Sequence, residues 1–139
     1  MKTVIVFGTF DLVHLGHIHL FRQAKRLGDE LLVVVARDET VRRVKGRRPY
    51  HSERERVALL RHIDLIDQVV LGNRTDVYRV IRTHRPAVIA LGYDQQAFVR
   101  ELTRLLQSIR PDAKIVRLRP HRRAKEKSGK MKDYLKRMV

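Results

Sequence analysis

Two histidines three residues apart lie near the start of the chain, in a short segment that also contains two glycines. The segment runs from Gly8 to His17 in the order Gly-Thr-Phe-Asp-Leu-Val-His-Leu-Gly-His. The imidazole rings of His14 and His17 can each donate a hydrogen bond to an anion. If a helix begins here, its unpaired N–H groups add further donors and the positive end of the helix dipole. The segment therefore predicts a phosphate site.

A metal site is one alternative for these histidines, because side chains three residues apart share a face of a helix. However, the sequence has no cysteine, and no acidic residue follows at ligand spacing on the same helix. Two unrelated surface histidines are the other alternative, against which stands Gly16, which lets a ligand approach the backbone closely. The sequence favours an anion site and predicts no metal held directly by protein ligands.

The elements around the histidines follow the pattern of an α/β sheet. Residues 3–7 are apolar and mostly β-branched, which is typical of a buried strand in a parallel sheet. From Gly16 to Leu27 apolar residues recur at helical spacing, and Gly28 ends the pattern. His14 then lies in a strand-to-helix loop and His17 in the first helical turn. That edge of a sheet is where α/β proteins bind ligands.

The rest of the chain repeats the alternation of strand and helix. Further buried strands are predicted at residues 31–36, 69–71, 87–91 and 114–118, with amphipathic helices between them. A capping box of Ser52 and Glu55 begins one of these helices. The pattern predicts an α/β fold with a parallel sheet of about five strands, in a single domain over residues 1–139.

The chain is strongly basic, with 31 Lys and Arg against 15 Asp and Glu and a net charge of +16. Such a charge attracts a triphosphate, a nucleic acid or an anionic membrane surface. No stretch has the length of a membrane span, and the apolar run after Lys2 is too short for a signal peptide. Because cysteine is also absent, we expect a cytoplasmic protein with no membrane partner.

The segment from Gly8 to His17 resembles the signature of the cytidylyltransferase-like nucleotidyltransferases, which share its His-x-Gly-His core. The resemblance implies a Rossmann-like, doubly wound sheet. It also implies transfer of a nucleotidyl group from a nucleoside triphosphate to a phosphorylated acceptor, with release of pyrophosphate. His14 and His17 would contact the triphosphate and stabilise its charge, while Asp11 is assigned to the acceptor. Backbone contacts to the nucleotide are assigned to the start of the segment: Gly8, Thr9 and Phe10.

A basic segment at residues 39–49 follows the second predicted strand and is expected to be a loop. By composition alone it is a solvated surface loop, but its position places it at the same edge of the sheet as the histidines. There it could close over the substrates as a lid and neutralise phosphate charge. Members of the family carry a phosphate-contacting lysine here. This assigns Lys45 to catalysis and to the acceptor, and Arg47 to the acceptor.

Two further segments resemble the archaeal FAD synthases of this superfamily: Leu-Gly-Tyr-Asp-Gln at 91–95, and Ala-Arg-Asp-Glu-Thr-Val at 36–41 followed by Lys-Gly-Arg at 45–47. The resemblance implies an FMN adenylyltransferase that uses ATP, with Gly92 and Asp94 at the nucleotide. Asp94 could instead only cap the next helix. The alternative is a glycerol-3-phosphate cytidylyltransferase that uses CTP, which has a basic residue where this chain has Asp64.

The chain from about residue 119 is predicted to form a basic loop and a last helix. It has few apolar residues for membrane anchoring and no aromatic residue between positions 117 and 132 to stack bases, so nucleic acid is not the favoured partner. The family resemblance assigns Arg122, Arg123 and Ser128 to the triphosphate. Three apolar residues are expected to pack the helix: Met131, Leu135 and Met138. The C-terminal cysteines that archaeal FAD synthases often carry are missing.

The expected mechanism is in-line attack of an acceptor phosphate oxygen on the α-phosphorus, helped by positioning and charge neutralisation. Mg²⁺ or another divalent cation would bridge the triphosphate oxygens. A nucleic-acid-binding module is a third hypothesis, which predicts binding that weakens steeply with salt and does not need His14 or His17. A homodimer is expected only by analogy with the family.

Overall fold

Five strands form the centre of the protein, in the order β3-β2-β1-β4-β5. Every neighbouring pair is parallel. The computed structural model describes residues 1–93, 95, 99–120 and 128–138, the last range without the side chains of 128–131. The strands are β1 (Thr3–Gly8), β2 (Glu30–Val35), β3 (Gln68–Leu71), β4 (Val88–Leu91) and β5 (Lys114–Arg117). The predicted α/β fold with a parallel sheet of five strands is confirmed.

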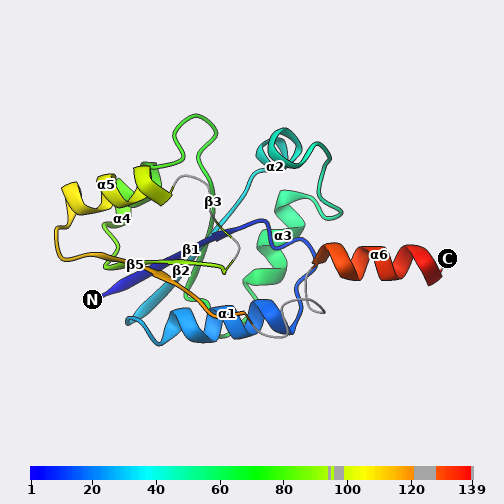
Figure 1. The fold of residues 1–139 in the computed structure, drawn as a ribbon, viewed down its shortest axis with the longest axis horizontal. Coiled ribbons are helices and arrows are strands. Elements are labelled where there is room, and N and C mark those ends of the chain that lie inside the picture. Colours follow the sequence, from blue (N-terminus) through cyan, green and yellow to red (C-terminus); the bar gives the residue numbers. More distant parts are fainter. Residues whose placement is uncertain (94, 96–98, 121–127, 139) are drawn as a thin grey trace.

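Helices cover both faces of the sheet, as Figure 1 shows. They are α1 (Leu15–Lys25), α2 (Asp38–Lys45), α3 (Glu53–Leu60), α4 (Arg79–His84), α5 (Val99–Ile109) and α6 (Ser128–Met138). Alternate residues of each buried strand point to opposite faces. Val4 and Val6 therefore pack with residues of α1 and α3, whereas Ile89 packs with residues of α4 and α5. Both faces are apolar because both are covered.

The strand order reverses beside β1, which pairs with β2 on one side and with β4 on the other. In an open α/β sheet the carboxyl ends of the two strands at such a reversal diverge and leave a crevice for a ligand. Here those ends are Gly8 and Leu91. The segment that carries the two histidines follows Gly8 directly, so the fold places it at this crevice.

The basic segment after β2 differs from the predicted loop, because most of it is helix α2. Acidic residues occupy its first turn and basic residues its last, which suits the helix dipole at both ends. Gly46 ends the helix with a φ of 80°, a left-handed conformation that glycine adopts without strain. High charge hid this helix from the sequence analysis, and the loop is confined to the residues between Gly46 and α3.

The last helix also differs from expectation. Leu135 and Met138 are 52% and 67% exposed, so they do not pack α6 against the sheet; the side chain of Met131 lies outside the described residues. Figure 1 shows α6 projecting away from the body of the molecule. Lys132, in the first half of the helix, forms an ion pair with Asp11. None of the helices in the described part of the chain is long and apolar enough to cross a membrane.

Candidate active site

A cavity of about 640 Å³ opens at the carboxyl ends of β1 and β4. The segment Phe7–Asp11 and the two histidines form its centre. Residues of α2 and of the loop after it line one side, and residues at the ends of β4 and β5 line the other. Lys132 of α6 also lines the cavity. The structure thus brings together His14, His17, Lys45, Arg47 and Gly92, which the sequence placed in one site.

The two imidazole rings are fixed by the start of α1. Gly16 N donates to Nδ1 of His14 at 3.0 Å, and His14 N donates to Nδ1 of His17 at 3.2 Å. The ring centroids lie 4.0 Å apart. Because each Nδ1 accepts a backbone N–H, a neutral ring must carry its proton on Nε2. Both Nε2 atoms are therefore hydrogen-bond donors.

The charge of His17 is set by its surroundings. Burial lowers the pKa of His17 from 6.5 to about 4, and the nearby His14 contributes to the shift. His17 is therefore neutral at pH 7 in the free protein and presents an N–H dipole rather than a positive charge. The sequence predicted that the two histidines stabilise phosphate charge, and the geometry supplies an Nε2 donor from each ring for that role.

The side chain of Phe10 packs against His17 and leaves no room for a side chain at position 8. The Phe10 ring lies edge-on to the His17 ring, with centroids 5.4 Å apart, and also packs against Phe21. A Cβ atom at Gly8 would lie 2.5 Å from the Phe10 ring, which is too close for any side chain. Phe10 itself has a φ of 53°, which is uncommon for a non-glycine residue. The sequence predicted only backbone contacts for Phe10, and its buried side chain was not predicted to support the site.

Asp11 joins three parts of the site. Its side chain is 4% exposed, and its two oxygens accept from Tyr50 N at 2.7 Å and His51 N at 2.8 Å. Lys132 also donates to Asp11. Burial alone would raise the pKa of Asp11, but the hydrogen bonds from His51, Lys132 and Tyr50 together lower it. The carboxylate therefore ties the histidine segment to the end of the basic loop and to α6.

Arg56 is a buried residue that supports the site and was not among the predicted site residues. It is 1% exposed, and its guanidinium donates to Thr9 O at 2.8 Å, His51 O at 3.1 Å and Asp38 Oδ1 at 2.7 Å. The signal was present in the helical spacing, because Arg56 shares a face of α3 with Val57 and Leu60, both buried.

The turn after β4 is held by two side chains. Gln95 accepts from Gly92 N at 2.8 Å and donates to Phe7 O at 3.0 Å, so it connects the ends of β4 and β1. Arg117 donates to the carbonyl oxygens of Gly92 and Gln95 at 3.0 and 2.6 Å. Neither Gln95 nor Arg117 was a predicted site residue, because their role depends on strands that are distant in sequence.

Several cations line the cavity. Lys45, Arg47 and Arg48 are exposed, and the ion pairs of the described residues involve none of them. Arg119 lines the other side, where its backbone N–H and C=O both bond the side chain of Gln23. Four predicted nucleotide contacts lie outside the described residues: Asp94, Arg122, Arg123 and the side chain of Ser128.

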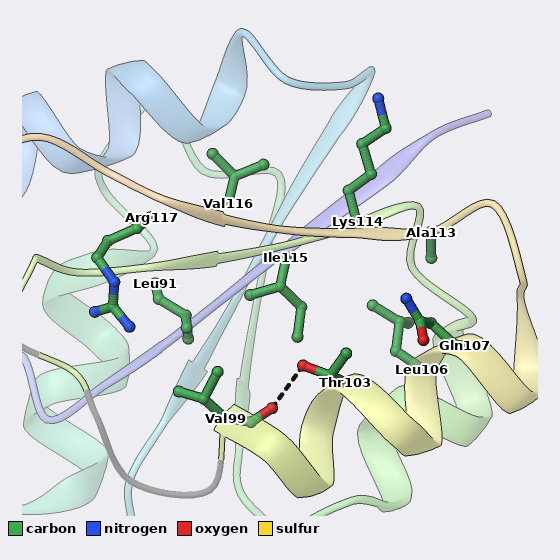
Figure 2. Close-up of a pocket in the computed structure, with 10 residues that line it drawn as sticks. All are labelled: Leu91, Val99, Thr103, Leu106, Gln107, Ala113, Lys114, Ile115, Val116 and Arg117. Atoms are coloured by element: carbon green, nitrogen blue, oxygen red, sulfur yellow. Dashed lines mark hydrogen bonds between the residues drawn. The ribbon is translucent and has the colours of Figure 1, made fainter.

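A second hollow, of about 550 Å³, lies between α5 and β5 and is shown in Figure 2. Leu91 and Ile115 point from the sheet toward α5, where Thr103 donates to Val99 O at 2.7 Å. Most of its lining is aliphatic, and it contains none of the predicted site residues. We therefore place the candidate active site at the crevice beside the histidines.

Comparison with known proteins identifies the family of the chain. The cytidylyltransferase-like family model matches residues 5–132, which include both histidines, most of β1 and the whole of the other four strands. The chain therefore belongs to the cytidylyltransferase-like family of nucleotidyltransferases. The predicted membership, drawn from the segment between Gly8 and His17, is confirmed.

Within the family, the chain is similar to several individual proteins. The chain is 45% identical to the FAD synthase of Pyrococcus abyssi over 116 residues, which cover 83% of this chain and 78% of the relative. It is 42% identical to the FAD synthase of Thermoplasma acidophilum over 118 residues, 85% of this chain and 82% of that one. A solved structure, the lipopolysaccharide core biosynthesis protein of Thermoplasma volcanium, aligns with a TM-score of 0.79 and 40% identity over 87% of this chain and 98% of its own.

Proposed function

We propose that the protein is an FMN adenylyltransferase, which transfers AMP from ATP to FMN and releases pyrophosphate. The observation that carries the proposal is the pair of Nε2 donors at the crevice, in a chain up to 45% identical to curated FAD synthases. We further propose that residues 1–139 act as a single nucleotidyltransferase domain.

The residues divide between the two substrates according to the side of the cavity they line. His14 and His17 would bind the triphosphate at the centre through their Nε2 donors. Backbone groups of Gly8, Thr9, Phe10 and Gly92 would surround the nucleotide, together with Asp94, Arg122, Arg123 and Ser128. Lys45 and Arg47 would bind the acceptor phosphate. The oxygens of Asp11 already accept three hydrogen bonds, so Asp11 would act on the acceptor by positioning the loop between Gly46 and α3.

The reaction forms a bond between a phosphate oxygen of FMN and the α-phosphorus, and breaks the bond from that phosphorus to the bridging oxygen of pyrophosphate. Negative charge builds on the phosphoryl oxygens, where fixed donors and cations stabilise it. Among the described residues no group of three or more His, Cys, Asp or Glu is arranged to hold a metal. Mg²⁺ or another divalent cation would enter with the triphosphate as part of the substrate.

The test is pyrophosphate release by the purified chain with Mg²⁺, with ATP and FMN in one reaction and CTP and glycerol 3-phosphate in the other. We expect release only in the first reaction, with FAD as the second product. Release only in the second reaction would establish the CTP-dependent alternative instead, and release in neither would contradict both assignments.

His17→Ala tests the role of the histidine pair in the same assay. We expect turnover to fall at least ~10²-fold, the order lost when one donor to transition-state charge is removed. His62→Ala is the matched control, because His62 is exposed after α3 and does not line the cavity. Near-normal turnover of the His17 variant would exclude the proposed role.

A further inference from the structure

Two valines on one face of α2, Val41 and Val44, form an apolar wall of the cavity. Thr40, Val41, Val44 and Lys45 line the cavity, and their spacing puts them on one side of the helix. Val41 is the buried member of this wall, with 5% of its surface exposed. Val44 is 74% exposed, although it lines the cavity. An aliphatic side chain thus borders the cavity that the substrates would fill.

Val44 has no packing role that accounts for it. It belongs to none of the hydrophobic core clusters in the described part of the chain. The helix around it is highly charged, with the sequence Asp-Glu-Thr-Val-Arg-Arg-Val-Lys. A single exposed valine needs no explanation on an open surface. Inside a cavity, apolar area is the usual contact for the apolar part of a small ligand.

Cations follow the valine directly. Lys45, Arg47 and Arg48 line the same side of the cavity, and they are exposed. This side therefore offers an aliphatic surface and, beside it, several positive charges. A ligand that matches both has a flat apolar ring system and a phosphate at the end of a short chain. FMN has this chemistry, whereas glycerol 3-phosphate has the phosphate alone.

We infer that the side chains of Val41 and Val44 form the surface on which the flavin ring of the acceptor lies, which makes Val44 a specificity-determining residue. This inference rests on the proposed function, which assigns the acceptor to the side of Lys45 and Arg47. The wall selects the ring and the cations hold the phosphate. Loss of one contact therefore weakens recognition of one part of FMN and leaves the other part unchanged.

The test uses two variants at Val44 that differ in polarity. Glutamine and leucine are both good helix formers of greater length than valine, so Val44→Gln and Val44→Leu preserve α2. Val77→Gln is the matched control, because Val77 is a 50% exposed valine that does not line the cavity. Arg47→Ala is the reciprocal variant, which removes a cation and keeps the wall.

Three ligands separate ring recognition from phosphate recognition. Lumiflavin carries the ring without a phosphate, inorganic phosphate carries no ring, and FMN carries both. Flavin binding is followed by fluorescence, and phosphate binding by inhibition of FAD formation. We expect Val44→Gln to weaken lumiflavin and FMN binding roughly tenfold, the order of one lost aliphatic contact. Inhibition by phosphate and the KM for ATP should stay unchanged. Arg47→Ala should weaken FMN and phosphate but leave lumiflavin as it was.

The outcomes distinguish this inference from the proposed function. If the wild-type chain forms no FAD from ATP and FMN, the proposed function fails and the inference fails with it. If the wild type forms FAD but Val44→Gln binds lumiflavin normally, the inference alone is overturned. Equal losses in Val44→Gln and Val44→Leu, or in the Val77 control, would overturn it as well. A loss confined to Val44→Gln and to the flavin ligands supports it.

Discussion

The start of α1 sets the proton positions of the histidine pair. A helix leaves its first N–H groups unpaired, and here the rings of His14 and His17 accept two backbone N–H groups at that helix start. Each ring therefore uses Nδ1 to accept a backbone N–H at the start of the helix, which leaves Nε2 as its donor. A substrate phosphate bound at Nε2 would not disturb the cap.

The depressed pKa of His17 predicts a measurable titration. Burial and the neighbouring His14 lower its pKa from 6.5 to about 4, so the ring should stay neutral from pH 5.5 to pH 8 in the free protein. ¹⁵N NMR of the imidazole groups should show the tautomer protonated at Nε2 over this whole range. A His17→Asn variant assigns the signal by its loss.

The same shift predicts how stability depends on pH. Since the folded protein binds this proton less readily than the unfolded chain, the unfolded state gains protons as the pH falls from 6.5 toward 4. Stability should therefore fall over that window more steeply in the wild type than in His17→Asn, as urea unfolding would measure. A doubly protonated His17 at pH 6, or identical pH profiles, would contradict the assignment.

At the scale of elements, α6 contacts the site through Lys132. The helix has 11 residues and exposed apolar side chains, and an isolated helix of this length is marginal in water. Its Lys132 pairs with the buried Asp11, which also holds the backbone of Tyr50 and His51. The ion pair thus connects the C-terminal helix to the loop proposed to bind the acceptor.

Removal of this ion pair should loosen α6 selectively. In Lys132→Ala we expect faster amide hydrogen exchange in residues 128–138, while exchange in α1 and the free energy of global unfolding stay nearly unchanged. Lys136→Ala is the control, because Lys136 is an exposed lysine of the same helix. Exchange in α6 that is equally slow in both variants would show that other contacts hold the helix.

Most elements of the fold were predictable because hydrophobic periodicity records burial. Buried β-branched runs marked the strands, and the Ser52–Glu55 capping box is present at the start of α3. Hydrophobic periodicity did not predict the elements whose structure does not depend on burial. Helix α2 is stabilised by the distribution of its charges and by Gly46 at its end, and Leu135 and Met138 of α6 are exposed rather than covered by the sheet.

The centre of the site was predictable and its support was not. The residues from Gly8 to His17 are contiguous, so one stretch of sequence contains the whole motif. Gln95 supports the site by a hydrogen bond to Phe7, Arg56 by one to Thr9, and Lys132 by one to Asp11. Each of these pairs joins residues far apart in the chain, and a single sequence does not show which distant residues meet.

At the scale of the whole molecule, part of the positive charge behind the net +16 lies at the cavity. Five cationic residues line it: Lys45, Arg47, Arg48, Arg119 and Lys132. Asp11 is the acidic residue among the described lining, and Lys132 and two backbone N–H groups already neutralise it. A cavity of one charge sign raises the local concentration of anionic substrates, while the same excess charge makes the folded chain repel itself.

These two effects of charge predict opposite responses to salt. Raising NaCl from about 0.01 M to about 0.15 M shortens the Debye length from about 30 Å to about 8 Å. Screening should raise the midpoint of thermal unfolding, because it weakens repulsion within the folded chain. The same change should lower kcat/KM for ATP and FMN, by roughly tenfold, because it weakens attraction of the anions to the cavity. The two measurements on one preparation check the prediction, and it is contradicted if both quantities change in the same direction.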